Sequence, residues 1–162
     1  MQQHGYDSYE DLKKARDELS AKMSDARNTA KSTDADLKLL NEKIHYLGQY
    51  LSTKAAYKAF LQAGNKKMYR SAHQDEIARY EEAIQFLKRN STDGTIPTMK
   101  NLRAEKEKLL SAQTAQYKSY TYFKDYYHEL QTACRNVDII LEMEHTQQHS
   151  RTQPKRSHKP SL

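Results

Sequence analysis

The stretch "KSYTYFKDYYHELQ", from Lys118 to Gln131, carries four tyrosines and a phenylalanine. Such a stretch is either an aromatic surface on which bases stack or the apolar seam of a long helix. Tyr120, Phe123 and Tyr127 follow one another at steps of three and four residues, which places them on one helix face. We therefore expect these three rings to be buried against another helix. The tyrosines that flank this face should be more exposed: Tyr117, Tyr122 and Tyr126.

The same spacing extends along much of the chain, as in the heptad seam of a coiled coil. One series lies in the first third of the chain: Leu12, Leu19, Met23, Ala26, Ala30, Thr33, Leu37, Leu40, Ile44, Leu47 and Leu51. A second series contains the aromatic stretch: Leu102, Leu109, Gln113, Gln116, Tyr120, Phe123, Tyr127, Leu130, Cys134, Val137 and Leu141. Because both series have the same length, we expect a long antiparallel hairpin that pairs Leu12 with Leu141 and Leu51 with Leu102. An up-down-up bundle of three helices is the alternative.

Capping and turn residues mark where the helices should begin and end. Asp7 or Ser8 is a suitable N-cap for the first helix, and Gly64 is suited to end it in the left-handed conformation. The middle segment must then bend near His73, and Asp93-Gly94 predicts a turn. The sequence thus predicts an all-α protein with one coiled-coil domain over residues 7–144. Residues 52–97 form its small helical tip, and residues 145–162 form a disordered basic tail.

The composition is typical of long helices and argues against a disulfide-bonded, a membrane-spanning or a secreted protein. The 162 residues include only four glycines and three prolines, and charged residues make up 30%. The single cysteine, Cys134, cannot form a disulfide within the chain and is typical of a reducing compartment. No apolar segment is long enough to span a bilayer, and no signal peptide is apparent. We therefore expect a cytoplasmic protein without membrane contact.

Candidate catalytic groups are nearly absent. The sequence has no glycine-rich phosphate loop and no nucleophile elbow, and Cys134 lies on the seam. His145 and His149 have the spacing of a metal-binding pair, but two imidazoles without a third ligand make a poor site on a segment expected to fray. We expect no enzyme activity, no cofactor and no metal site.

The distribution of charge points to a different kind of site. No aspartate or glutamate occurs between Lys43 and Gln74, and the predicted tip carries Lys54, Lys58, Lys66, Lys67 and Arg70. Tyr57 and Tyr69 lie among these cations, and four more cations lie in the tail: Arg151, Lys155, Arg156 and Lys159. Cations neutralise phosphates and aromatic rings stack on unpaired bases, so these residues predict binding of single-stranded DNA. Alternatively, the rings pack the tip and the lysines only solvate it.

The tip sequence also resembles a known family. Residues 50–77, "YLSTKAAYKAFLQAGNKKMYRSAHQDEI", are similar to the helical region behind the nuclease domain of conjugative relaxases, the mobilisation proteins of plasmids and integrative conjugative elements. The likeness continues through Ile96-Pro97, Tyr117-x2-Tyr120 and Asn136-Val137-Asp138, covering about residues 44–141.

The resemblance implies a role in DNA transfer but no catalysis. In that family a tyrosine becomes linked to the cleaved strand and a histidine cluster holds a metal. Here no histidine-hydrophobic-histidine pair occurs and nothing similar to the nuclease domain precedes residue 7, so no catalytic residue carries over. The resemblance implies a non-catalytic C-terminal module that binds DNA or relaxosome proteins, and a homodimer is a further expected partner state. The alternative is a coiled-coil adaptor that binds another protein and has no nucleic-acid role.

Overall fold

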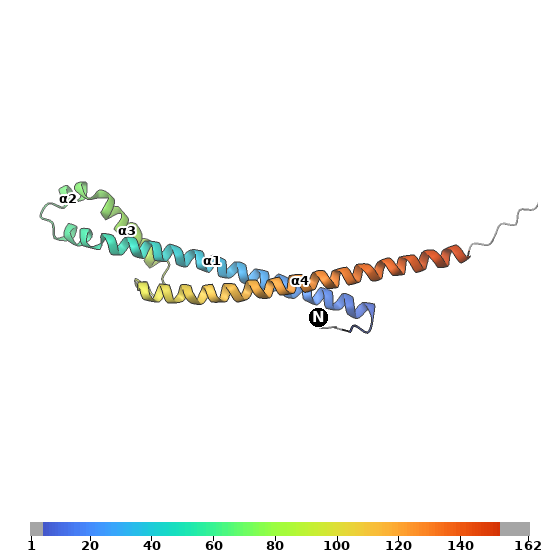
Figure 1. Ribbon diagram of the computed structural model, residues 1–162. Helices are drawn as coiled ribbons and strands as arrows, with labels where there is room; N and C mark the ends of the chain where they lie inside the picture. Colours follow the sequence, from blue (N-terminus) through green and yellow to red (C-terminus); the bar gives the residue numbers. More distant parts are fainter. Residues whose placement is uncertain (1–4, 153–162) are drawn as a thin grey trace, which may run out of the picture. The chain divides into compact units, whose positions relative to one another are not determined.

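The computed structural model describes residues 5–152, and this part of the chain is 89% helical without a strand (Figure 1). The predicted all-α class is confirmed. The helices are α1 (Tyr9–Gln62), α2 (Lys66–Ala72), α3 (Gln74–Arg89) and α4 (Met99–Thr152). Backbone contacts divide the chain into two units. The described part of the first unit comprises residues 5–27 and 118–152, the second unit comprises residues 28–117, and α1 and α4 contribute to both.

Helix α1 begins as the sequence predicts but ends differently. The Ser8 hydroxyl accepts a hydrogen bond from the Asp11 amide at 3.1 Å, so Ser8 caps the helix. At the other end, the Ala63 amide donates to the Phe60 carbonyl at 3.2 Å. This tight final turn satisfies a terminal carbonyl without a left-handed residue. The predicted left-handed conformation of Gly64 is therefore wrong, since Gly94 is the only described glycine with positive φ.

The expected interruption near His73 separates α2 from α3. The Asn65 side chain caps α2 by accepting from the Met68 amide at 3.1 Å. His73 leaves the helical conformation, with φ −121° and ψ 29°, and its ring stacks on Tyr69 at a centroid distance of 4.2 Å. The chain therefore changes direction here without a glycine or proline.

The predicted turn at Asp93-Gly94 connects α3 with α4. Gly94 has φ 71°, a conformation that glycine adopts without steric cost. The Asp93 carboxylate accepts hydrogen bonds from the Thr95 hydroxyl, the Ser91 hydroxyl and the Thr95 amide, at 2.7, 2.7 and 3.0 Å. These bonds, that of the Thr95 hydroxyl first, lower the pKa of Asp93 to about 2.

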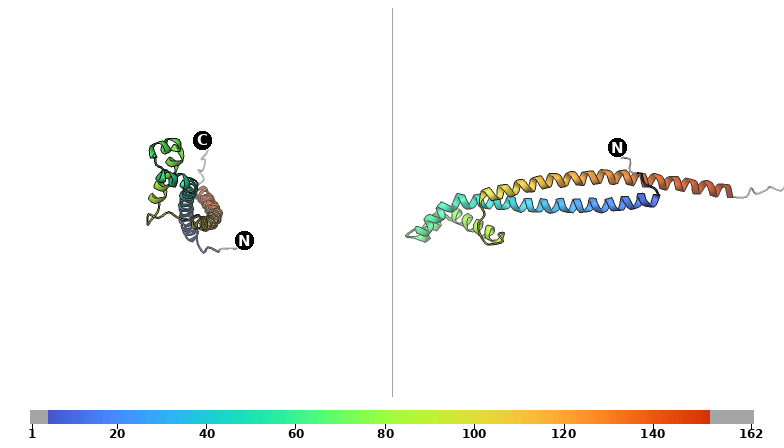
Figure 2. Two further views of the ribbon diagram at one scale, coloured as in Figure 1. Left: turned by 90° about the vertical axis from the view of Figure 1, so that its left-hand side faces the viewer. Right: turned by 90° about the horizontal axis from the view of Figure 1, so that it is seen from below.

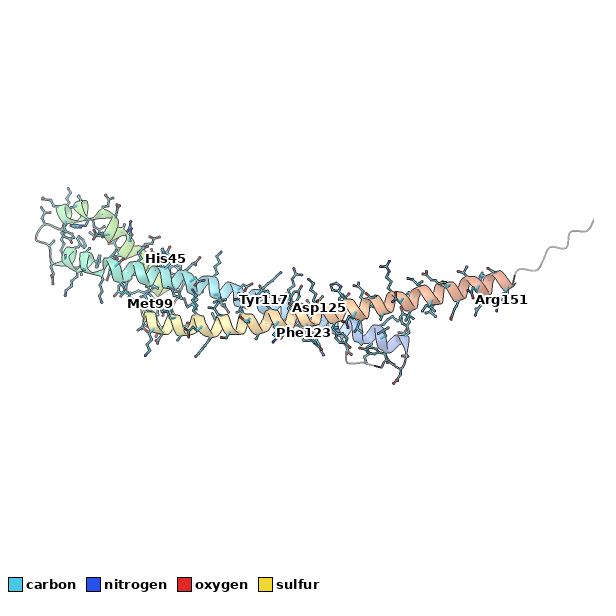
Figure 3. The ribbon with its side chains drawn as sticks, viewed as in Figure 1. His45, Met99, Tyr117, Phe123, Asp125 and Arg151 are labelled. Carbon is cyan, nitrogen blue, oxygen red and sulfur yellow. The ribbon has the colours of Figure 1, made fainter. Side chains whose placement is uncertain are left out.

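The first unit has a two-helix core. The start of α1 lies beside the later part of α4, and Leu12 and Leu19 form a buried cluster with Leu130 and Cys134 (Figure 2). Half-buried aromatic and aliphatic side chains surround this cluster: Phe123, Tyr126, Tyr127 and Val137. Figure 3 shows Phe123 on this stretch of α4. Leu12 and Val137 thus belong to the same apolar cluster.

Tyrosine hydroxyls form hydrogen bonds at the border of the apolar cluster in the first unit. The Tyr6 and Tyr126 hydroxyls share a hydrogen bond of 2.7 Å, and the Tyr9 hydroxyl donates to the Asp138 carboxylate. The pKa of Tyr126 is raised to about 12, first by burial and then by its bond to Tyr6. The expected burial of Tyr120, Phe123 and Tyr127 is wrong, because all three rings are half-buried, and Tyr126 is half-buried as well, with its hydroxyl bonded to Tyr6. Tyr117 and Tyr122 are exposed, as predicted.

The second unit has a third helix in its core. Leu40 and Leu47 of α1 form a buried cluster with Leu87 of α3 and Leu102 of α4. Helix α3 lies beside α1 in Figure 1 and in the right-hand view of Figure 2. Two further α3 residues, Ile77 and Ala83, are buried. The third helix therefore gives this unit a more enclosed core than two helices provide.

Two seam positions and one boundary differ from the sequence-based prediction. Leu51 is 52% exposed, because Leu47 and not Leu51 packs beside Leu102. Leu141 is 47% exposed, because α1 begins at Tyr9, whose hydroxyl bonds to Asp138, and so does not reach Leu141. The pairing is thus about one helical turn from the expected one. Residues 145–152, expected in the tail, are helical because α4 continues to Thr152, whereas the rest of the predicted tail lies outside the described residues.

Candidate nucleic-acid interface

Four exposed lysines lie close together in sequence around the junction of α1 and α2. Lys54 and Lys58 are one turn apart on α1, and Lys66 and Lys67 begin α2. In the described part of the chain none of the four forms an ion pair. The Lys54 ammonium lies 5.7 Å from the centroid of the Tyr50 ring. The charges of these lysines are therefore available to an anionic ligand.

Arg70, the fifth predicted cation, differs from the lysines. Its guanidinium forms an ion pair of 2.8 Å with Glu81 of α3 and lies 5.0 Å from the centroid of the Phe60 ring of α1. These contacts join α2 to its two neighbours. Because a carboxylate already balances its charge, Arg70 contributes less than a free lysine to attraction of phosphate.

The predicted stacking residues pack against other rings of the tip. The Tyr57 ring stacks on Tyr80 with centroids 3.9 Å apart and an interplanar angle of 15°. The Tyr69 ring stacks on His73. Burial raises the pKa of Tyr80, consistent with an apolar environment in this cluster. Since Tyr57 and Tyr69 each have one face occupied within the chain, their stacking on bases stays a prediction.

Exposed apolar side chains accompany the lysines, a feature the sequence reasoning did not identify. Leu51, Lys54, Lys58 and Leu61 follow the heptad spacing and so continue the α1 seam along one face. Leu61 is 54% exposed, and Met68 on α2 is 70% exposed. The heptad spacing itself carries this signal, because it continues through Lys54 and Lys58 to Leu61.

A groove of about 860 Å³ lies elsewhere in the second unit and was also not predicted. At one end the Asp34 carboxylate accepts hydrogen bonds from Tyr117 at 2.5 Å and from Gln113 at 2.7 Å. The bond from Tyr117, followed by that from Gln113, lowers the pKa of Asp34. The bond between Tyr117 and Asp34 also raises the pKa of Tyr117. His45 also lines the groove and is labelled with Tyr117 in Figure 3. The remaining lining is mixed in character: Leu37, Lys38, Asn41, Glu42, Tyr46, Phe86, Lys106 and Leu110.

The tail residues are only partly within the structure. Arg151 is exposed near the end of α4, where Figure 3 labels it. Lys155, Arg156 and Lys159 lie outside the described residues. The predicted contribution of the tail to DNA binding therefore rests on its composition.

Within residues 5–152, no group of three or more histidine, cysteine, aspartate or glutamate side chains is placed to hold a metal ion. No helix in this part of the chain is long and apolar enough to cross a membrane. Comparisons with protein-family models, curated proteins and solved structures found no match.

Proposed function

We propose that this chain is a non-catalytic helical module that binds single-stranded DNA through Lys54, Lys58, Lys66 and Lys67. The observation that carries the proposal is that these four lysines are exposed and without an acidic partner among the described residues. The resemblance to conjugative relaxases supplies the context, an accessory role in DNA transfer beside DNA or relaxosome proteins. This role requires no nucleophile or metal ligand in the module itself.

Phosphate contacts account for the proposed affinity better than base stacking does. A lysine that neutralises a phosphate releases condensed counterions, and this gain does not depend on base sequence. Tyr57 and Tyr69, in contrast, would have to offer their remaining faces or leave Tyr80 and His73. We therefore propose weak binding without sequence preference, with a minor contribution from the rings.

Charge reversal in the tip tests this proposal. The variants K54E/K58E and K66E/K67E should each weaken binding of a labelled oligothymidine roughly tenfold, measured by fluorescence anisotropy at low salt. The matched control is K22E/K31E, which makes the same change in charge at two exposed positions of α1 outside the tip. If the control weakens binding as much as the tip variants, the binding is a property of overall charge and the proposed interface is wrong.

A second candidate function is an adaptor that binds an amphipathic helix with acidic flanks. Three exposed side chains favour it: Leu51 and Leu61 lie with lysines on a continuation of the α1 seam, and Met68 lies beside Lys67 on α2. The double variant L51Q/L61Q separates the two functions because it preserves charge. Unchanged oligothymidine binding in this variant supports the DNA module, whereas negligible DNA binding by the unmodified chain favours the adaptor.

We also propose that α1 and α4 form an antiparallel coiled-coil hairpin. In support, Leu12 packs with Cys134 in the first unit and Leu47 with Leu102 in the second. Spin labels at Lys22 and Lys124 should then be close, and labels at Lys22 and Lys106 far apart. A reversed order of these two distances would favour a parallel arrangement.

A further inference from the structure

Helix α4 extends beyond the place where α1 begins in the first unit. The Tyr9 hydroxyl, at the first residue of α1, bonds to Asp138, and α4 then continues to Thr152. This extension has the exposed apolar residues Ile139, Ile140, Leu141 and Met143. The part of α4 before this extension packs against α1. In the described part of the chain, no element covers the apolar side chains of the extension.

Two histidines occupy one face of this extension. His145 and His149 are both exposed, and their ring centroids are 5.6 Å apart. Two imidazoles that coordinate one tetrahedral zinc ion through bonds of about 2.0–2.1 Å place their centroids about 5 Å apart. Because residues 145–152 are helical, the pair is held close to the separation that coordination requires. This removes the expected fraying that had argued against a metal site.

One chain supplies only half of a zinc site. Structural zinc sites have four protein ligands, and the described residues contain no group of three that could hold a metal ion. A second copy would bring an identical pair of imidazoles and complete the tetrahedron. In a dimer with two-fold symmetry, each copy uses the same surface, and a shared ion lies on the axis.

We propose that His145 and His149 from two copies of this chain bind one zinc ion and thereby join the copies through the extension of α4. The exposed apolar residues of the extension support the second copy as the partner. Leu141 falls on the continuation of the seam that packs against α1 through Cys134, and His145, four residues further on, is its neighbour on the helix surface. The dimer contact is thus continuous with an interface already present in the chain, and metal coordination fixes which copies meet.

Zinc titration of the untagged full chain tests this proposal. The mass measured by light scattering should double, with saturation at one zinc ion per two chains, and EDTA should restore the starting mass. Magnesium at the same concentration should have no effect because it prefers oxygen ligands. Binding of one zinc ion per chain without a change in mass would overturn the proposal, as would a dimer whose dissociation constant zinc does not alter.

Single substitutions identify the ligands. H145A and H149A should each weaken zinc-dependent dimerisation at least tenfold, because each removes two of the four ligands from the dimer. H128A is the matched control, since it removes another exposed histidine of α4. All three changes are at exposed helical positions, and circular dichroism will verify that helicity is kept. Dimerisation that survives in H145A/H149A, or that is lost equally in H128A, would contradict the assignment of these ligands.

Discussion

The two units bury their apolar cores with different numbers of helices, three in the second unit and two in the first. In the second unit, Leu87 from α3 joins the leucines of α1 and α4 and is only 1% exposed. In the first unit, two helices alone form the core, and Leu12 is 9% exposed. Tyrosines from both helices and from the preceding segment surround that core, with hydroxyls bonded as Tyr6–Tyr126 and Tyr9–Asp138.

This difference teaches how a narrow apolar seam can be enclosed. A third helix covers leucines with other aliphatic side chains, which removes them almost fully from water. Where no third helix is present, large amphipathic rings cover the seam and keep their hydroxyls hydrogen-bonded at the edge. We therefore expect the second unit to depend mostly on apolar burial and the first unit to depend more on its tyrosines.

The largest expected effect is at Leu87. L87A should lower the free energy of unfolding by about 4 kcal/mol, because it opens a cavity in an enclosed core. L12A should cost about 2 kcal/mol, since water already reaches the edge of the two-helix core. The measurement is urea unfolding followed by circular dichroism, with the 43% exposed Leu110 changed to alanine as a control. Equal losses in L87A and L12A would remove the proposed difference between the units.

Phe123 tests how much an aromatic side chain contributes to the first unit. The sequence predicts a buried ring, and the structure has it half-buried against the cluster of Leu12 and Leu130. F123A should therefore cost about 2 kcal/mol in urea unfolding, less than the loss typical of a fully buried phenylalanine. The control is Y122A, since Tyr122 is 61% exposed. A loss near zero in F123A would show that the ring is not part of the core.

The turn before α4 should give a smaller effect. G94A should destabilise the second unit by about 1–2 kcal/mol because Gly94 has φ 71°, where a Cβ is strained. No neighbouring atom lies within 4 Å of the added Cβ, so the cost comes from the backbone alone. Gly64 is equally open but lacks positive φ, and G64A should be close to neutral. Equal costs at the two positions would contradict this account of the turn.

The smallest effect concerns alkaline pH and the first unit. Tyr9 has its pKa raised from 10.0 to about 12, chiefly by its hydrogen bond to Asp138. Its contribution to stability is therefore complete below pH 10 and is lost as the pH rises towards 12. Y9F should lack this part of the pH dependence, measured as the thermal midpoint across that range. A pH dependence identical in both proteins would exclude the Tyr9–Asp138 contact as its source.

The sequence was sufficient to predict helices and seams, since periodicity is a local property. It could not predict where a seam loses its partner. Leu51 and Leu141 have the correct spacing, but α4 begins only near Leu47, and α1 begins near Asp138. The exposure of these leucines depends on the ends of another helix, which heptad spacing does not encode.

The sequence predicts which cations belong to the candidate site but not which side chains contact them. The absence of acids between Lys43 and Gln74 identified the cations directly. It could not show that Arg70 would pair with Glu81 or that Tyr57 would stack on Tyr80, because both partners belong to α3, beyond this stretch. Contacts of this kind depend on the fold that brings α3 back along α1.

The most direct test of the proposed function is the salt dependence of oligothymidine binding by the unmodified chain and by K66E/K67E. Neutralisation of about four phosphates predicts a log–log slope near −3 for the unmodified chain, and loss of two lysines should reduce it to about half that value. A slope that is unchanged in the variant, or one near zero in the unmodified chain, would contradict phosphate binding by these lysines.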